Sequence, residues 1–183
     1  VAMPVAIAPT GLTGIMHPDG EIHAARAAAA FGVPFALSTV SILSIEQVRA
    51  AVAEPFWFQL YVMRDRGFVA ELIQRAVQAE CSALVLTADL QVQGQRHRDL
   101  KNGLTVPPKL TLANVLDVCT KPRWALGMLG AQGRSFGNLA GYAPTGRGLS
   151  TLSQWIAGQF DPALSWKDVA WVRSLWPGKL IVK

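Results

Sequence analysis

Four short apolar segments begin near residues 4, 34, 56 and 83, and a helical segment follows each of them except the last. The third, "FWFQLYV" at 56–62, is rich in the aromatic and β-branched residues that strands prefer. A fifth apolar segment begins near residue 179, directly after another helical segment. Strands that alternate with helices predict a parallel sheet of the α/β class.

The expected helices carry recognisable start and stop signals. Gly32 is typical of a C-terminal cap, and Ser44 with Gln47 forms the pattern of an N-terminal capping box. The segment 67–80 places its apolar residues on one face. We expect helices at 21–31, 44–53, 67–80 and, capped by Ser165 and Asp168, at 164–176.

A long interval, 90–163, separates the fourth strand from the last helix. It is rich in Gly, Pro and Ser apart from a short helical piece at 111–118, and loops of this length are usually functional or disordered. Within it, residues 121–136 mix basic side chains with Trp, Leu and Met, a composition suited to an anionic membrane surface. A mobile lid over a binding site would have the same composition, so both interpretations stay open.

Composition narrows the functional classes. The 183 residues suit one domain, and the net charge of +5 comes without a run of four Lys or Arg or a basic helix interleaved with aromatics, which argues against nucleic acid. Cys81 and Cys119 lie far apart without a CxxC motif, which favours a reduced, cytoplasmic protein. His17, His23 and His97 lack metal-binding spacing. We expect no metal site.

The sequence contains neither a complete phosphate-binding loop nor a hydrolase motif. No apolar window is long enough to span a membrane. "GYAPTGRG" lacks the Lys and Ser/Thr of a phosphate-binding loop, and GxSxG does not occur. The longest apolar stretches stay below eighteen residues.

Polar residues cluster where the expected strands end. The carboxyl ends of parallel strands meet at one edge, which is where α/β folds bind ligands. Gln59 within so apolar a strand needs a partner, since a buried unsatisfied amide costs about 1–3 kcal/mol, and Lys183 needs an anion or a dipole. The residues at these ends are Pro9, Thr10, Gly11, Ser38, Thr39, Gln59, Tyr61, Thr87, Asp89 and Lys183.

Five stretches carry a family resemblance: "APTGLTGIMHPDGE", "LST", "FQLYV", "LTADLQVQGQRHRDLKNG" and "LIVK". In this order and spacing they resemble the FMN-dependent α-hydroxy-acid dehydrogenase and oxidase family, which includes L-lactate dehydrogenases, glycolate oxidases and mandelate dehydrogenases. The resemblance implies a TIM (β/α)8 barrel of about 250 residues or more. Residues 1–183 would then form the N-terminal part of one FMN-binding barrel domain, from its first to its fifth strand, with 90–163 inserted after the fourth.

The resemblance also implies the cofactor contacts. The backbone of Pro9, Thr10 and Gly11 would lie against the flavin near N5. Ser38, Gln59 and Thr87 would hydrogen-bond the polar edge of the ring. Lys183 would stand beside N1 and O2, where its charge stabilises negative charge on the flavin.

The remaining site residues follow by matched position. Tyr61 would donate to the hydroxyl or carboxylate of the substrate, and Arg96, seven residues past Asp89, would hold the anionic substrate. Asp89 would orient a catalytic His, as carboxylates do in base–carboxylate pairs. Val40 would face the side chain of the substrate. That His and the FMN phosphate site belong to the second half of the family's chain, so we expect residues 1–183 alone to be inactive.

The expected activity is oxidation of an L-2-hydroxy acid, foremost L-lactate, to the 2-oxo acid. Gly11 stands where oxidases of the family often carry Ala, which favours transfer of electrons to a quinone or cytochrome over an oxygen-using oxidase. A self-contained open α/β binding or regulatory domain is the alternative from another class. We also expect a homo-oligomer, because a half-barrel leaves apolar strand edges exposed, and a peripheral position at the inner face of the cell membrane.

Overall fold

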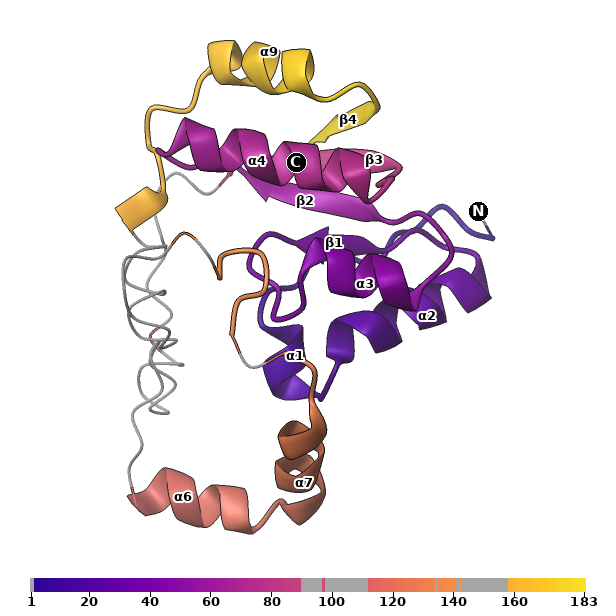
Figure 1. The fold of residues 1–183 in the computed structure, drawn as a ribbon, viewed down its shortest axis with the longest axis vertical. Helices are drawn as coiled ribbons and strands as arrows, with labels where there is room; N and C mark the ends of the chain where they lie inside the picture. The colour runs from indigo at the N-terminus through magenta and orange to yellow at the C-terminus, as the bar shows by residue number, and fades with distance from the viewer. Residues whose placement is uncertain (1, 90–96, 98–111, 134, 141, 143–157) are drawn as a thin grey trace.

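The computed structural model of the chain describes residues 2–89, 97, 112–133, 135–140, 142 and 158–183. Its centre is a sheet of four strands that are all parallel and follow one another in chain order (Figure 1). The strands are β1 (Ala36–Ser38), β2 (Trp57–Tyr61), β3 (Ala83–Thr87) and β4 (Lys179–Val182).

Sequential strand order is the signature of a barrel. Right-handed crossovers between consecutive parallel strands place all the connecting helices on one side of the sheet, whereas a doubly wound sheet reverses its order at a switch point. Figure 1 shows α2, α3, α4 and α9 succeeding one another from bottom to top alongside the strands. The strand order therefore fits the first part of a (β/α)8 barrel, the fold that the family resemblance implies, whereas the strand and helix pattern by itself predicted only a parallel α/β sheet.

The first expected strand is much shorter than predicted. Instead of a strand from residue 4, the chain forms a single parallel bridge between Ile7 and Phe35. Ile7 N donates to Pro34 O at 2.8 Å, and Ala36 N donates to Ile7 O at 3.1 Å. Pro4 and Pro9 have no N–H to donate, so a longer hydrogen-bonded ladder cannot form around Ile7.

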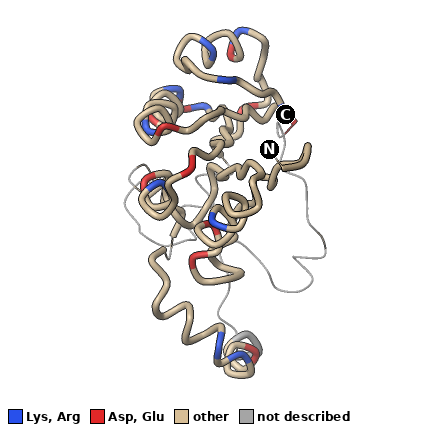
Figure 2. Tube along the Cα trace, turned by 90° about the vertical axis from the view of Figure 1, so that its right-hand side faces the viewer, with Lys and Arg blue, Asp and Glu red and all other residues tan. Residues whose placement is uncertain are grey.

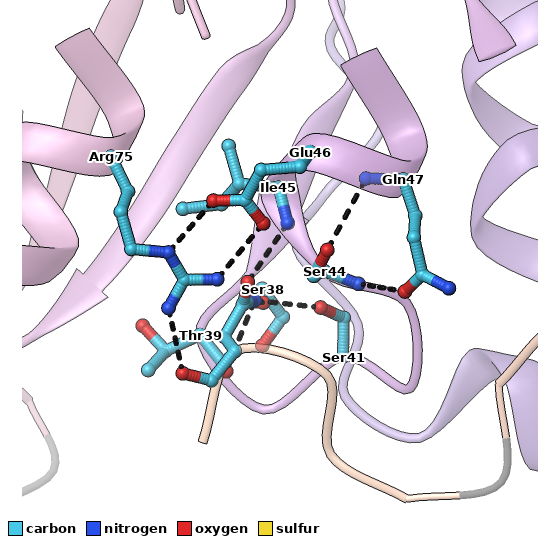
Figure 3. Close-up of polar contacts among 9 residues, drawn as sticks. Ser38, Thr39, Ser41, Ser44, Ile45, Glu46, Gln47 and Arg75 are labelled. Atoms are coloured by element: carbon cyan, nitrogen blue, oxygen red, sulfur yellow. Dashed lines mark hydrogen bonds and ion pairs between the residues drawn. The ribbon is translucent and has the colours of Figure 1, made fainter. Parts of the chain in front are cut away.

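The helices begin and end close to their predicted bounds. Gly32 caps α2 with a left-handed φ of 74°, a backbone conformation that residues with a side chain rarely adopt. Ser44 and Gln47 form the predicted capping box: Gln47 N donates to Ser44 Oγ at 3.2 Å, and Ser44 N donates to Gln47 Oε1 at 2.9 Å (Figure 3). The helices of the body are α1 (Thr13–Met16), α2 (Gly20–Phe31), α3 (Ile45–Ala51), α4 (Arg66–Gln78) and α9 (Trp166–Leu175).

The core lies between the sheet and these helices. Leu37, Phe58 and Leu84 are fully buried, and the apolar face of α4, including Phe68 and Leu72, belongs to the same core. Burying each such side chain stabilises the fold by roughly 1.5–3 kcal/mol. Because strand side chains alternate, the residues between them point to the opposite face, which is the inside of the barrel.

Two helices of the insertion stand apart from this body. Figure 1 shows α6 (Leu112–Cys119) and α7 (Pro122–Gly130) at the end of the molecule remote from β4. Trp124 at the start of α7 donates its indole N–H to Ile15 O at 3.1 Å and so attaches this helix to α1. The sequence pattern predicted a helix near α6 but not α7, which contains two glycines. None of the described helices is long and apolar enough to cross a membrane.

Candidate functional site

Three polar side chains form a continuous hydrogen-bonded chain across β1, β2 and β3. Gln59 Oε1 accepts from Ser38 Oγ at 3.2 Å and from Thr39 N at 3.3 Å. Gln59 Nε2 donates to Thr87 Oγ1 at 2.8 Å. All four residues are buried, Gln59 with 1% of its surface exposed. The buried amide therefore has the partners that its position requires.

The strand register places these residues on one face of the sheet. Ser38 lies beside Gln59, and Tyr61 lies beside Thr87. Gln59 also lies beside Val85, which lies beside Ile181, and Lys183 follows Ile181 by two residues. Since side chains two apart in a strand share a face, Lys183 points to the same side as Gln59 and Thr87. We call Ser38, Gln59, Thr87 and Lys183 the polar rim.

The cation at the end of β4 has a partner. Lys183 Nζ lies 3.2 Å from Asp89 Oδ2, and the two side chains are 48% and 65% exposed. Lys183 N also donates to Leu86 O, and Ala88 N donates to Lys183 O, both at 2.8 Å, so the backbone that carries the pair is fixed. The role predicted for Asp89, orientation of a histidine, stays a prediction.

The segment Pro9–Gly11 lies against the loop after β1. Leu12 N donates to Val40 O at 3.1 Å. A Cβ on Gly11 would lie 2.7 Å from Val40 Cγ2, so this approach requires glycine unless Val40 moves. Thr10 is exposed, and its carbonyl accepts from Thr13 Oγ1 at 3.0 Å. Two segments assigned to the site from sequence thus meet in the structure.

The returning end of the insertion contacts Tyr61 on one side. Phe160 meets its ring edge-on, with centroids 5.6 Å apart and an interplanar angle of 82°. An antiparallel bridge joins Phe160 to Met63, and Arg66 pairs with both Asp161 and Asp168 at 2.9 and 2.7 Å. Phe160 therefore forms a wall beside Tyr61. Arg96, the other expected substrate ligand, lies outside the described residues.

Sequence reasoning missed two buried polar residues that hold the loops of the site, Asn138 and Glu21, although it placed Thr39 at a strand end. Thr39 Oγ1 donates to Gln59 O at 2.6 Å, and Asn138 from the insertion hydrogen-bonds the loop after β1. Glu21 Oε1 accepts from Gly14 N at 3.0 Å and Ile42 N at 2.9 Å, which joins that loop to α1. A Glu in the first turn of a helix looks like an ordinary helix-dipole residue, so no local signal distinguished Glu21.

The comparisons with known proteins agree with this architecture. The model of the family "FMN-dependent dehydrogenase" matches residues 1–183, the whole chain. The chain belongs to the FMN-dependent dehydrogenase family, and FMN is the cofactor of that family.

Within this family, the chain is similar to L-lactate dehydrogenases in sequence and to mandelate dehydrogenase and oxidase in structure. An L-lactate dehydrogenase of Xanthomonas campestris pv. campestris is 46% identical over 185 residues, and one of Caulobacter vibrioides is 47% identical over 184. The crystal structure of the monotopic membrane protein (S)-mandelate dehydrogenase superposes with a TM-score of 0.88 at 37% identity over 98% of this chain. A mandelate oxidase structure superposes over 98% of this chain with a TM-score of 0.70 at 33% identity.

Coverage of these relatives is partial. The match includes the whole of this chain but only 47% and 48% of the two L-lactate dehydrogenases. It covers 48% of the mandelate dehydrogenase chain and 44% of the mandelate oxidase chain. The chain thus spans about half the length of the relatives that it matches.

The donors of the polar rim fit the polar edge of a flavin. That edge presents carbonyl oxygens and ring nitrogens, and it needs hydrogen-bond donors and a cation. One amide hydrogen of Gln59 and the hydroxyl hydrogen of Thr87 have no acceptor among the described residues. Lys183 adds an ammonium group on the same face. The residues present therefore suit FMN.

Proposed function

We propose that the chain provides the first half of the FMN site of an L-2-hydroxy-acid dehydrogenase, with L-lactate as substrate. The L-lactate dehydrogenases among its relatives support the substrate class. The single structural observation that supports it most is the polar rim, in which side chains from β1, β2 and β3 are joined by hydrogen bonds on the face that also carries Lys183.

The roles proposed for the rim follow from its chemistry. Bound FMN supplies the acceptor for the two electrons that leave the 2-hydroxy acid. Gln59 and Thr87 donate hydrogen bonds to the polar edge of the ring, and Ser38 holds the Gln59 amide in the required orientation. Lys183 places a positive charge where negative charge develops, the arrangement by which preorganised sites lower barriers. Pro9–Gly11 would supply backbone against the flavin near N5.

The substrate is proposed to lie between the flavin and Tyr61. The Tyr61 hydroxyl donates to its hydroxyl or carboxylate, Arg96 neutralises the carboxylate, and Val40 contacts the side chain. Asp89 holds the histidine that removes the proton of the substrate. Because the family's histidine and phosphate site lie outside the matched half, residues 1–183 alone are expected to retain FMN weakly and to turn over no L-lactate.

A dye-reduction assay tests the activity. The full-length flavoprotein should be yellow and should reduce an artificial acceptor in the presence of L-lactate. Oxygen consumption should be slow beside quinone reduction; fast oxygen consumption would favour the oxidase. A protein that neither binds FMN nor responds to any 2-hydroxy acid would favour the open α/β binding module instead. Normal turnover by purified residues 1–183 would contradict the proposed division of the site.

We also propose that the insertion contacts the cell membrane peripherally, from the cytoplasmic side, through residues 121–136. Leu126 and Leu129 on α7 are each 69% exposed, and Leu116 on α6 is 60% exposed. Figure 2 shows basic and acidic residues together where α6 meets α7, and Lys121 there pairs with Asp117. Exposed leucines beside Lys and Arg suit an anionic lipid surface. The structural neighbour described as a monotopic membrane protein supports this proposal.

Vesicle co-sedimentation tests the membrane contact. Leu126→Ser with Leu129→Ser should reduce binding of the full-length protein to vesicles that contain anionic lipid. Val77→Ser, which changes an exposed apolar residue on α4, serves as the matched control and should bind like the parent. Equal binding of all three proteins would contradict the membrane contact and favour the interpretation of the insertion as a lid.

Self-association is proposed from the strand at the edge of the described sheet. Ile181 and Val182 of β4 are 36% and 49% exposed, although strand residues of this kind are usually covered. Size-exclusion chromatography of purified residues 1–183 should give an oligomer, because this part of the barrel leaves the β4 edge uncovered; a monomer at micromolar concentration would contradict this expectation.

A further inference from the structure

The side-chain amide of Asn138, a residue of the insertion, hydrogen-bonds the loop that follows β1. Asn138 is 1% exposed, and its Oδ1 accepts from Ile45 N at 2.9 Å. Its Nδ2 donates to Ser41 Oγ at 3.0 Å, to Ser38 O at 3.3 Å and, at longer range, to Thr39 O at 3.4 Å. Figure 3 shows these residues of the loop gathered around one centre of dashed contacts. The loop 38–45 is therefore closed around Asn138.

The backbone beside Asn138 approaches this loop as closely as glycine allows. Gly137 N donates to Ile42 O at 3.0 Å. A Cβ on Gly137 would lie 2.5 Å from Ser44 N, a main-chain atom that cannot move aside. A Cβ on Gly133 would also lie too close, 2.9 Å from Ile42 Cγ2. Gly133 and Gly137 are thus both packed closely against the loop, and at Gly137 the contact is main chain against main chain.

An ion pair holds Asn138 from the other side. Arg75 Nη1 donates to Asn138 O at 3.0 Å, while its Nε and Nη2 bind the two carboxylate oxygens of Glu46 at 2.7 and 2.9 Å (Figure 3). Bidentate pairs of this kind fix geometry as well as charge. The Arg75 hydrogen bond lowers the pKa of Glu46 to about 2. Helices α3 and α4 are thereby both tied to the insertion.

The residues that Asn138 holds are the ones that hold the rim. Ser38 and Thr39 present Oγ and N to Gln59 Oε1, and Gln59 in turn reaches Thr87. We propose that Asn138 is a positioning residue for the flavin edge: it sets the backbone of Ser38 and Thr39, and through them the orientation of Gln59. The insertion thereby shapes the cofactor site, which extends the function proposed above and rests on it.

The test compares substitutions at Asn138 with a matched control at the same loop. Asn138→Ala removes the whole amide, and Asn138→Asp keeps the acceptor for Ile45 but places a carboxylate against two carbonyls. Gln47→Ala disrupts the Ser44 capping box without touching Ser38 or Thr39. The dissociation constant of FMN is measured by fluorescence titration of the full-length apoprotein, together with the visible spectrum of the saturated protein.

Positioning predicts that both Asn138 variants bind FMN about tenfold more weakly or worse and shift the absorption bands of bound flavin. The Gln47 variant should lower the melting temperature yet keep the dissociation constant within twofold of the parent. Asn138 variants that match the parent in both FMN readouts would overturn the inference and leave the proposed function intact.

Amide hydrogen exchange distinguishes failure of the proposed function from failure of the positioning role of Asn138. If the parent protein binds no FMN, the proposed function fails, and exchange in residues 38–45 still decides the positioning role. Asn138→Ala should then speed exchange in this loop by about tenfold or more at a temperature where α2 stays protected. Exchange equal to that of the parent would refute the role, and it can be measured on a variant of reduced stability.

Discussion

Gln59 donates a hydrogen bond of 2.8 Å to the hydroxyl of Thr87, so that the amide of one strand and the alcohol of its neighbour form one unit at the carboxyl edge of the sheet. The other end of the same amide accepts from Ser38 and Thr39. Three consecutive strands are therefore connected by side chains as well as by their backbones, and the rim keeps its shape before any ligand arrives.

Replacing Gln59 should destabilise the fold as well as the site. Gln59→Leu leaves the Ser38 hydroxyl and the Thr39 N–H buried without their acceptor, and each unsatisfied group costs about 1–3 kcal/mol. Urea denaturation should show a lower free energy of unfolding and FMN binding should be lost. Gln74→Leu, an exposed glutamine on α4, is the control and should stay within about 0.5 kcal/mol of the parent. An equal loss of unfolding free energy in both variants would show that the hydrogen bonds of Gln59 do not stabilise the fold.

Removing the charge at the end of β4 should slow catalysis in the full-length enzyme. Lys183→Met should lower kcat for L-lactate by about 100-fold, the scale seen when one electrostatic group of a preorganised site is removed. Lys179→Met, at the exposed start of the same strand, is the matched control and should leave kcat unchanged. If Lys183→Met keeps the parent rate, the lysine belongs only to the pair with Asp89.

The Glu46–Arg75 pair makes a small contribution to stability that depends on pH. The pKa of Glu46 falls from its usual 4.5 to about 2 in the folded chain, chiefly through the hydrogen bond from Arg75. Since the folded pKa is lowered, the stabilisation is present above about pH 4.5 and is lost as the pH falls toward 2. The Glu46 side chain is 54% exposed, so solvent screening limits the effect to about 1 kcal/mol or less.

Glu46→Gln tests this dependence. The difference in unfolding free energy between parent and variant should be largest near pH 6 and should vanish as the pH approaches 2, as measured by urea denaturation at several pH values. A difference that stays constant over this range would mean that the carboxylate charge contributes nothing.

The two cysteines should differ in reactivity. Burial raises the pKa of the Cys81 thiol to about 12, so little thiolate is present near neutral pH, and its side chain lies in the core. Cys119 at the end of α6 is exposed. In purified residues 1–183, a thiol reagent at pH 8 should modify one cysteine in the native protein and two in denaturant. Cys119→Ser should abolish the native reaction; labelling of Cys81 in the folded protein would contradict its placement in the core.

Much of the fold could be predicted because it depends on short-range patterns. The capping box of Ser44 and Gln47 and the glycine cap at Gly32 involve residues that are neighbours along the chain, and both are confirmed. The same local reasoning placed polar residues at strand ends, and the register confirms that Gln59, Thr87 and Lys183 share a face. Their chemical roles, and that of Arg96, stay predictions.

The sequence alone therefore determined most of the elements, their order and which residues stand where strands end, since side-chain periodicity and capping act within a few residues; it did not predict α1 or α7, and it predicted too long a first strand. Only the tertiary structure decided how these ends are held. Asn138 meets Ile45 across 93 positions of sequence, and Glu21 meets Ile42 across 21. Such contacts leave no periodic trace, because an amide or a carboxylate acquires its partners only when the folded backbone brings distant donors within about 3 Å.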